Sequence, residues 1–525
     1  MSTGSQRRRM LFQNVRRNAK VFFKSRLGVT GTAIIAFFVL IAIFAPLLST
    51  NDPIFGINVS SPYSVPVWST FIPRYQNLPP TEVTVRGGQF SSQSDLSSWS
   101  FIGTGYNTSL TRITTSGVNQ TYGAVQVNQR FTPNSSAIVN NLVPGQPLVT
   151  FTQSFTYSYK PPTSFIASAV VEPLAMKNVS VIYVNFLLSS PGRNYSLGSI
   201  NSFVIRGEIT FTSADIGKPK AVNISSGLLP SSGNPAFPIT SDPAGLVFSK
   251  NGTYGFGMQV LGVGSGKQSS YSLAIGDVSF KIVGRAYGLL GTDVYGRDIW
   301  SQFVWGSRVS ILVGVLSAIG AVVIGTLAGL GAGLVGGWTD EIISRITDFF
   351  LVIPFLPLAV VVIFFLGQNP TLFKGIYYWI ILLFVALSWP TVTRIVRSQV
   401  LIVKERAFVE ASRALGGGSG HIMTKHILPN VLGLVYAQTA LLVPGFILTE
   451  AALDFLAVAV HPVNTITWGI MLTDALNNAA LTNAAVDYAW WWFLPPGIAI
   501  ALLSLAFVMV GYALDNVFNP KLRQR

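Results

Sequence analysis

The sequence predicts an α-helical membrane protein with six transmembrane helices and a mainly β-stranded domain inserted after the first helix. Three observations lead to this fold class. The 525 residues are 50% hydrophobic and only 10% charged, whereas soluble domains carry about 25% charged residues. Six apolar segments are long enough to cross a bilayer. A long stretch rich in Ser, Thr, Asn and Gly separates the first segment from the other five.

The composition excludes several kinds of site. The chain has no Cys, so neither a disulfide nor a cysteine-based metal site can form. Its three His (421, 426 and 461) make a metal centre unexpected. A net charge of +15 would suggest nucleic acid in a soluble protein, but here Lys and Arg gather beside the apolar segments. We therefore expect the lipid bilayer as a partner, no nucleic acid and no metal.

Residues 28–48 form the first predicted transmembrane helix. At 1.5 Å per residue this uncharged run reaches about 30 Å, the thickness of the hydrocarbon core. A cleaved signal peptide is the alternative, because the basic segment 1–27 precedes the run. The apolar part of a signal peptide is usually only about 7–15 residues long, so we favour a membrane anchor.

The other five predicted spans lie within residues 289–525, at about 309–334, 349–367, 376–393, 430–453 and 493–514. Their Gly and Pro residues are ordinary in membrane helices. The 430–453 span is unusual, because Pro444 and Gly445 indicate a kink and Glu450 and Asp454 lie at its end. Ionisable groups inside a membrane are functional candidates, so both are candidates for the translocation pathway. A structural role for Glu450 and a position of Asp454 at the water interface are the alternatives.

Lys and Arg beside the spans predict the orientation. Eight lie in the first 26 residues, six in the 394–428 connection and three in the tail, whereas 461–488 has none. With six spans, the three basic regions fall on one side of the membrane. We therefore expect a multi-pass plasma-membrane protein with cytoplasmic N- and C-termini and an extracellular insert over residues 49–288.

The insert is predicted to be a glycosylated β domain, with a β-sandwich as its expected architecture. Residues 179–186, 203–211 and 271–283 have the composition of strands between turn signals. Every N-x-[ST] sequon of the chain lies in the insert, although a composition rich in Asn, Ser and Thr would also produce sequons. Few charges and many sequons favour an archaeal surface. The sequon residues are Asn58, Asn107, Asn119, Asn134, Asn178, Asn194, Asn223 and Asn251.

The connection 400–429 carries the most informative motif. Val400–Leu415 is amphipathic and lacks Gly and Pro, which predicts a helix. Three glycines, 416–418, then permit a sharp reversal of the chain. Ser419 is the predicted N-cap of a second short helix that ends before Pro429. A solvated hairpin on the membrane surface is the alternative to a functional role.

Glu410-Ala411-Ser412, followed by Gly416 and by Leu-Pro twelve residues later, resembles the EAA loop of permease subunits in ATP-driven (ABC-type) importers. The His-Ile-Leu-Pro-Asn sequence at 426–430 resembles the dipeptide/oligopeptide variant of that loop. In this family the loop docks on an ATPase subunit. The resemblance therefore assigns ATPase coupling to Glu410, Ala411, Ser412, Arg413, Leu415, Gly416, His426, Leu428 and Pro429.

The resemblance covers about residues 11–53 and 289–523, and it implies the type I ABC importer permease fold. Its further motifs lie at 51–53, 290–298, 306–310, 336–340, 468–472 and 491–497. Two departures stand out. The insert is many times longer than the family's usual link, and Asp454 stands where the family favours Ser.

The resemblance implies a transport subunit and not an enzyme. Its implied partners are a homologous second permease subunit, two ABC ATPase subunits and an extracellular substrate-binding protein. ATP and Mg would be bound by the ATPases, with no cofactor on this chain. The only approximation to a phosphate-binding loop, at 261–268, has Leu261 for the first Gly and Gln268 for the Ser or Thr.

The motifs favour di- and oligopeptides as substrate, with oligosaccharides as the alternative. A membrane-anchored surface glycoprotein is the rival class of function, but it leaves the 405–430 pattern unexplained. The insert itself could dock a binding protein, shield the external mouth or contact a cell-surface layer.

Overall fold

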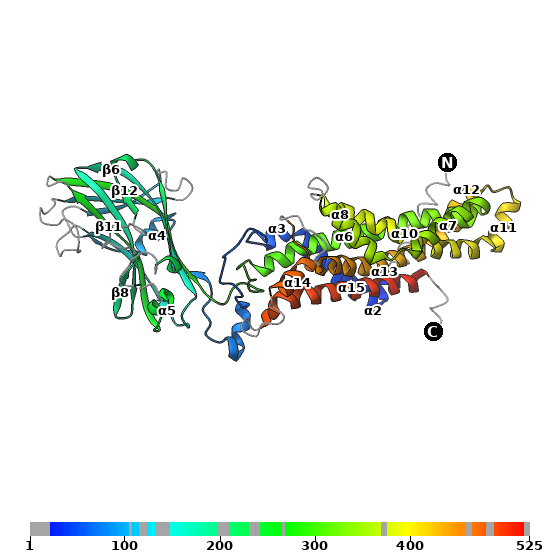
Figure 1. The fold of residues 1–525 in the computed structure, drawn as a ribbon, viewed down its shortest axis with the longest axis horizontal. Helices are drawn as coiled ribbons and strands as arrows, with labels where there is room; N and C mark the ends of the chain where they lie inside the picture. Colours follow the sequence, from blue (N-terminus) through cyan, green and yellow to red (C-terminus); the bar gives the residue numbers. More distant parts are fainter. Residues whose placement is uncertain are drawn as a thin grey trace. The chain divides into compact units, whose positions relative to one another are not determined.

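The computed structural model describes residues 21–103, 108–114, 123–131, 148–197, 209–229, 237, 242–264, 268–368, 375–456, 465–478 and 488–518. The chain divides into a helical unit, Met1–Ile57 with Arg297–Arg525, and a β unit, Asn58–Gly296 (Figure 1). These boundaries differ from the predicted limits of the insert, 49 and 288. Backbone hydrogen bonds join the two ends of the β unit, from Asn58 to Tyr295 (3.1 Å) and from Tyr63 to Asp293 (2.9 Å).

Long apolar helices build the helical unit. Five described helices are long and apolar enough to span a membrane (α2, α6, α10, α13 and α15), and the bent pair α7–α8 makes a sixth candidate. The bounds are α2 Arg26–Ile43, α3 Ala45–Leu48, α6 Ile299–Val335, α7 Gly337–Val352, α8 Phe355–Gly367, α10 Ile376–Lys404, α11 Ala407–Ala414, α12 Ser419–Ile422, α13 Leu428–Phe455, α14 Trp468–Asn477 and α15 Trp490–Phe518.

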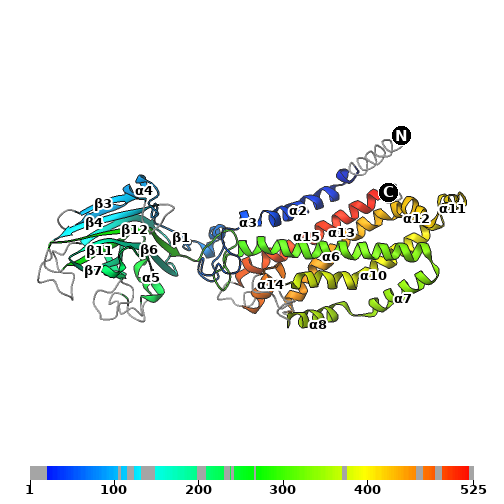
Figure 2. The same cartoon turned by 90° about the horizontal axis from the view of Figure 1, so that it is seen from above.

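The third predicted span, 349–367, is not one straight helix. The structure bends by 81° between α7 and α8 (Figure 2). Ile353 has an extended backbone, with φ −72° and ψ 125°, because the ring of Pro354 disfavours a helical conformation in the residue before it. The hydrophobic run therefore predicts apolar helix here but not the bend inside it, and the crossing of the membrane by this pair stays a prediction.

Glycines on one face of α6 let it pack closely on α10 (Figure 2). A Cβ atom added at Gly325 would lie 2.5 Å from Cβ of Val392, and one at Gly329 would lie 2.8 Å from Cβ of Val396. The next position one turn on, Gly333, faces Val400 in the same way. Helices in lipid associate through such small residues, because close backbone approach replaces the hydrophobic driving force found in water.

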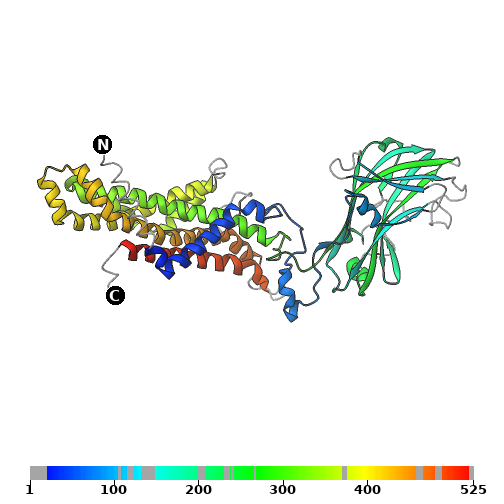
Figure 3. The ribbon, with the colours of Figure 1, turned by 180° about the vertical axis from the view of Figure 1, so that it is seen from behind.

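The β unit is a sandwich of two six-stranded sheets (Figure 3). One sheet has the order β10-β6-β12-β4-β3 with β1 on β12, and the other has β2-β5-β11-β7-β8 with β9 on β7. All these pairings are antiparallel. The strands are β1 Glu82–Val83, β2 Ser100–Gly103, β3 Thr108–Ile113, β4 Ala124–Phe131, β5 Leu148–Tyr157, β6 Ser164–Lys177, β7 Val179–Ser190, β8 Arg193–Ser196, β9 Ile209–Phe211, β10 Lys220–Ser225, β11 Gly252–Gly264 and β12 Ser269–Val283.

The strand predictions at 179–186 and 271–283 are confirmed by β7 and β12. Of the predicted strand 203–211, only 209–211 lies within the described residues, as β9. The segment resembling a phosphate loop begins at the end of strand β11 and leads into β12, with 265–267 outside the described residues. Its flanks are therefore strands, and no helix follows it to complete a phosphate cradle.

Aromatic side chains fill the space between the two sheets. Phe280 on β12 stacks on Phe256 of the opposite sheet, with ring centroids 4.6 Å apart. Phe165 on β6 lies 5.6 Å from the same Phe280 ring. All three side chains are fully buried, so the expected β-sandwich has a core of its own.

Two aspartates stabilise short turns at the surface of the β unit. Asp95 and Asp215 each complete a capping box. A hydrogen bond from Lys220 lowers the pKa of Asp215 to about 2. An aspartate whose pKa is lower in the folded than in the unfolded protein stabilises the fold at any pH above its unfolded pKa of about 3.9. This contribution is lost only as the pH falls through the folded pKa of about 2, so the turn at Asp215 keeps it in mild acid.

We expect the excised segment 58–296 to fold and Phe280→Ala to lower its free energy of unfolding by about 3–5 kcal/mol, because the change leaves a cavity between the sheets. Urea denaturation followed by circular dichroism measures this. Leu228→Ala, at a side chain that is 64% exposed, is the matched control and should change stability by less than about 0.5 kcal/mol. Equal effects of the two changes would contradict the assigned core.

Candidate functional site

Residues 405–430, the coupling segment, form a compact helical turn at the junction of α10 and α13. The predicted helix Val400–Leu415 is interrupted, because α10 ends at Lys404 and Arg406 is extended, with ψ 140°. The extended residue turns the chain so that α11 runs in a new direction and Val409 reaches the bundle. Val409 is fully buried in a cluster of branched aliphatic side chains from α6, α10 and α13.

The reversal after α11 depends on Gly416. Its φ of +82° is a left-handed conformation that residues with a Cβ atom rarely adopt, although the space around it is open. The N–H of Gly417 then donates to the carbonyl oxygen of Ser412 at 2.9 Å. The sharp reversal predicted at 416–418 is therefore present, with the left-handed conformation at its first glycine.

The second half of the coupling segment differs from the prediction. Gly418, and not Ser419, occupies the N-cap position of α12. The helix also does not stop before Pro429, because a π-helical turn at Met423–Ile427 leads directly into α13. Pro429 lies inside this continuous helix, directly after the π-helical turn, in which the N–H of Leu428 donates to the carbonyl oxygen of Met423. Such a local π-helical adjustment accommodates a proline, which has no N–H to donate.

One face of the coupling segment is apolar and open to solvent. Phe408 is 46% exposed and Leu415 is 89% exposed, and Glu410 and Ala411 between them are also exposed. His426 is half-buried, with its ring centroid 6.0 Å from that of Phe408. Of the nine predicted coupling residues, six are exposed and three are partly buried: the exposed ones are Glu410, Ala411, Arg413, Leu415, Gly416 and Pro429, and the partly buried ones are Ser412, His426 and Leu428.

Ion pairs hold α7 against α10 beside this surface. Arg397 donates to both carboxylate oxygens of Asp340, at 2.5 and 2.7 Å, and Arg394 pairs with Asp348. The Nζ of Lys404 donates to carbonyl oxygens at the end of α6. The sequence shows these charges, but their pairing depends on α7 folding back along α10, which no local spacing indicates.

The two candidate pathway residues are buried inside the helical unit. Glu450 and Asp454 are each 1% exposed, so the expected position of Asp454 at the water interface is wrong. The hydroxyl of Ser310 on α6 donates to Oε2 of Glu450 at 3.2 Å. The hydroxyl of Thr467, which caps α14, donates to Oδ2 of Asp454 at 2.5 Å. Within this subunit both side chains face protein.

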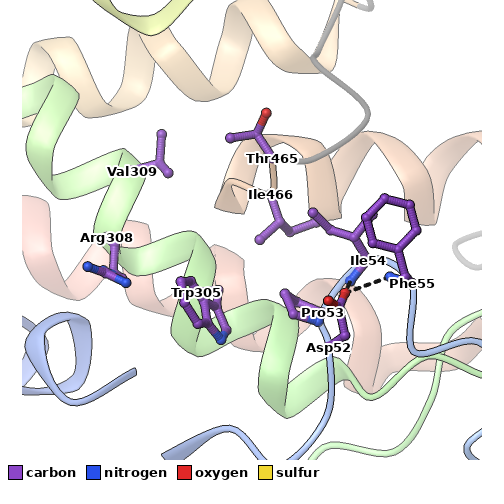
Figure 4. A pocket seen from close by; sticks show the side chains of 9 residues that line it. All are labelled: Asp52, Pro53, Ile54, Phe55, Trp305, Arg308, Val309, Thr465 and Ile466. Atoms are coloured by element: carbon purple, nitrogen blue, oxygen red, sulfur yellow. Dashed lines mark hydrogen bonds between the residues drawn. The ribbon is translucent and has the colours of Figure 1, made fainter. Parts of the chain in front are cut away.

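A cavity of about 400 Å³ lies where α3 is followed by the loop 52–55 (Figure 4). The guanidinium carbon of Arg308 lies 5.0 Å from the ring centroid of Trp305. Asp52 accepts hydrogen bonds from the backbone N–H groups of Ile54 and Phe55, at 2.8 and 2.7 Å. The remaining lining residues are Pro53, Val309, Thr465 and Ile466. The cavity thus joins two motifs that sequence analysis singled out separately, 51–53 and 306–310.

A bundle of long apolar helices with an exposed helical turn after α10 defines a multi-span membrane protein. Sequence comparisons agree. The family described as binding-protein-dependent transport system inner membrane component matches residues 298–524. The N-terminal transmembrane domain of oligopeptide transport permease C matches residues 11–80.

Relatives match at moderate identity. The oligopeptide transport system permease protein OppC of Bacillus subtilis is 37% identical over 234 residues, which cover 45% of this chain and 72% of the relative. OppC of Haemophilus influenzae is 35% identical over 239 residues (45% and 71%). A putative peptide permease protein of Brucella suis is 36% identical over 231 residues (44% and 72%). The chain belongs to the oligopeptide/dipeptide permease family of ABC transporters, and it is a membrane transport permease.

Solved structures align only weakly with the chain. A mannan-recognising carbohydrate-binding module aligns at a TM-score of 0.19 and 11% identity, covering 39% of this chain and 96% of the module. A bacteriophage tailspike protein aligns at a TM-score of 0.21 and 11% identity, covering 37% of this chain and 20% of that protein. Likeness at this level carries no conclusion about ligand or function.

Proposed function

We propose that this chain forms half of the translocation pathway of an ATP-driven importer, together with a homologous second permease subunit. Two ATPase subunits bind ATP and Mg and close on ATP, and an external binding protein delivers the substrate. Family membership supports this assembly. The observation that carries the proposal for this chain is the apolar face of the coupling segment, exposed at Leu415 and Phe408 and anchored through buried Val409.

The coupling segment transmits movement because it directly connects two membrane helices, α10 and α13. The segment follows α10 and leads without a break into α13. Val409 and Ile427 pack in the same aliphatic cluster, so a push on Leu415 moves α10, α11 and α13 together. Closure of the ATPases on ATP would then switch the pathway between inward and outward access.

Di- and oligopeptides are the substrate class that we propose. The relatives that match are named as oligopeptide, dipeptide or peptide permeases, and none of those cited is named for a sugar. The decisive experiment is uptake by the reconstituted transporter with its cognate binding protein, comparing dipeptides with oligosaccharides. Peptide-specific uptake supports the proposal, and uptake of oligosaccharides alone contradicts it.

We also propose that the coupling segment is cytoplasmic and the β unit extracellular. The basic residues near the spans support this orientation. The five described sequon residues (Asn58, Asn178, Asn194, Asn223 and Asn251) all have exposed side chains, and Asn107, Asn119 and Asn134 lie outside the described residues. In this arrangement the β unit would meet a binding protein, shield the pathway mouth or contact the cell-surface layer.

We expect Gly416→Val to uncouple ATP hydrolysis from uptake, because Val is strained at a φ of +82°. Gly418→Val is the matched control, since Gly418 has an extended backbone (φ −69°, ψ 161°) and open space around it. Uptake and ATPase rates are measured together in proteoliposomes. Gly416→Val should lose most uptake while the control keeps it. Full-rate uptake by Gly416→Val would contradict the coupling role.

Peptide mapping of protein from its native source tests the orientation. We expect glycans on sequon residues of the β unit, because an extracellular surface domain meets the glycosylation machinery. Asn77, which is exposed but lies outside any sequon, should stay bare. If every sequon is bare, the glycan argument for the orientation fails.

A further inference from the structure

A groove of about 860 Å³ lies on the helical unit, and the proposed coupling mechanism does not use it. Side chains of α6, α13 and α15 line this groove, together with Phe22 and Phe23 from the helical turn before α2. Among the lining residues, Val322 and Val443 are buried, whereas Phe23 and Val323 are more than half exposed. The groove therefore has a closed floor and an open rim.

The backbone around Ser25 places the two phenylalanines at the groove. The N–H of Ser25 donates to the carbonyl oxygen of Phe22 at 3.0 Å, and the Ser25 side chain caps α2 by accepting from the N–H of Gly28 at 3.3 Å. A Cβ atom added at Gly28 would lie 2.8 Å from that same carbonyl oxygen and 3.2 Å from Cβ of Ala513 on α15. The missing Cβ of Gly28 thus lets the turn that carries Phe22 and Phe23 lie against α15.

The described lining of the groove is almost entirely hydrocarbon. Its hydroxyl groups come from Tyr436 and Thr439 on α13, and every other lining side chain is Ala, Val, Leu, Ile or Phe. The hydroxyl of Thr439 donates to the carbonyl oxygen of Val435 at 2.9 Å, so it is satisfied within its own helix. In a bilayer, a groove of this kind is filled by a hydrocarbon chain or by another helix.

A hydrocarbon chain suits the rim better than a neighbouring helix does. Helices in lipid associate through small residues that let their backbones approach closely. The glycines of α6 at 320, 325 and 329 already face α10. Toward the groove, α6 presents Ile319 and Val323, which are exposed and branched. Branched side chains keep another backbone at a distance, whereas a flexible lipid chain fits between them.

Basic side chains follow the two phenylalanines directly in the chain. Lys24 and Arg26 are exposed, and neither forms an ion pair with any described residue. The first 26 residues carry eight Lys or Arg and no Asp or Glu. Asp515, the only acid on α15, does not line the groove. Anionic lipid headgroups attract basic segments beside membrane helices, so this part of the groove favours a negatively charged headgroup.

We propose that the groove binds an anionic membrane lipid, with a hydrocarbon chain between α6, α13 and α15 and its phosphate on Lys24 and Arg26. The bound lipid braces the coupling segment, because the groove adjoins the aliphatic cluster that contains Val409. Val322 belongs to both the groove and this cluster, and Val435 lines the groove and packs against the cluster. The inference goes beyond the proposed function, since lipid binding by this chain requires neither an ATPase nor a transported substrate.

Native mass spectrometry of the full-length subunit, alone and in the assembled transporter, tests the headgroup. The protein is offered equal amounts of phosphatidylglycerol, which is anionic, and phosphatidylcholine, which has no net charge. Wild-type protein should retain phosphatidylglycerol preferentially, and Lys24→Gln with Arg26→Gln should lower this preference by at least about fivefold, the effect of one basic residue at an anionic surface. Arg308→Gln with Arg345→Gln removes two exposed arginines outside the groove and should leave the preference unchanged. No preference in wild-type protein, or equal effects of the two double variants, would overturn the proposal.

Filling the groove tests the site of the hydrocarbon chain. Val323→Trp places a large ring on the rim and should reduce retention of both lipids. Leu327→Trp is the matched control, because Leu327 lies one turn further along α6 with an exposed side chain outside the groove. Unchanged retention in Val323→Trp contradicts a lipid chain in the groove. Retention by the subunit alone that disappears in the assembled transporter would assign the groove to the second permease subunit and likewise contradict the proposal.

Two further measurements test the bracing effect and do not depend on the groove variants. A ligand that binds only the folded state raises thermal stability, so phosphatidylglycerol should raise the melting temperature of wild-type protein more than phosphatidylcholine does. Val409→Cys gives a single thiol in the aliphatic cluster, since the natural chain has no Cys. Its reaction with a water-soluble maleimide should slow when phosphatidylglycerol is bound. Equal melting temperatures, or equal labelling rates with the two lipids, contradict bracing by an anionic lipid.

Discussion

The coupling segment depends on one apolar cluster, formed where α6, α10, α11 and α13 meet. Val400, Val409, Ile422 and Ile427 are buried together there. α11 has only eight residues, which is too short to be stable as an isolated helix in water. Burial of each Val or Ile side chain contributes about 1.5–3 kcal/mol. This cluster is therefore what fixes α11, and with it the exposed positions of Phe408 and Leu415.

The same helices connect this apolar cluster to the rest of the helical unit. The glycine face of α6 brings its backbone against Val392 and Val396 of α10, while Arg397 ties α10 to Asp340 on α7. α13 then connects the coupling segment to the buried carboxyl groups of Glu450 and Asp454 near its other end. Close packing at the glycines leaves little room for α6 and α10 to move independently of one another.

Much of this organisation could be predicted from local sequence. Apolar runs predict the spans because the bilayer requires them, and β-branched runs predict β7 and β12. The glycines at 416–418 predict the reversal because few other residues adopt a positive φ. Ser419 is a reasonable N-cap by composition, but α12 already begins at Ser419 and Gly418 takes the N-cap position.

Features that depend on residues far apart in sequence could not be predicted in this way. Asp454 looks like an interfacial residue until α14 folds back and places Thr467 and Gly469 against it. The pairing of Asp340 with Arg397, 57 residues later, likewise requires the return of α7 along α10. The interruption of the 400–415 helix at Arg406 follows from the burial of Val409 in a cluster built mainly by other helices.

Contact between Leu415 and an ATPase subunit is the central claim, and the absence of Cys from the natural sequence makes it directly measurable. Leu415→Cys gives a single thiol at the most exposed part of the coupling face. In the assembled transporter, a short thiol-reactive photo-cross-linker at this position should attach to the ATPase, and the yield should change with ATP. Leu228→Cys, on the β unit, is the matched control and should give no ATPase product. Equal yields from the two positions, or none from Leu415→Cys in an active complex, would contradict the account.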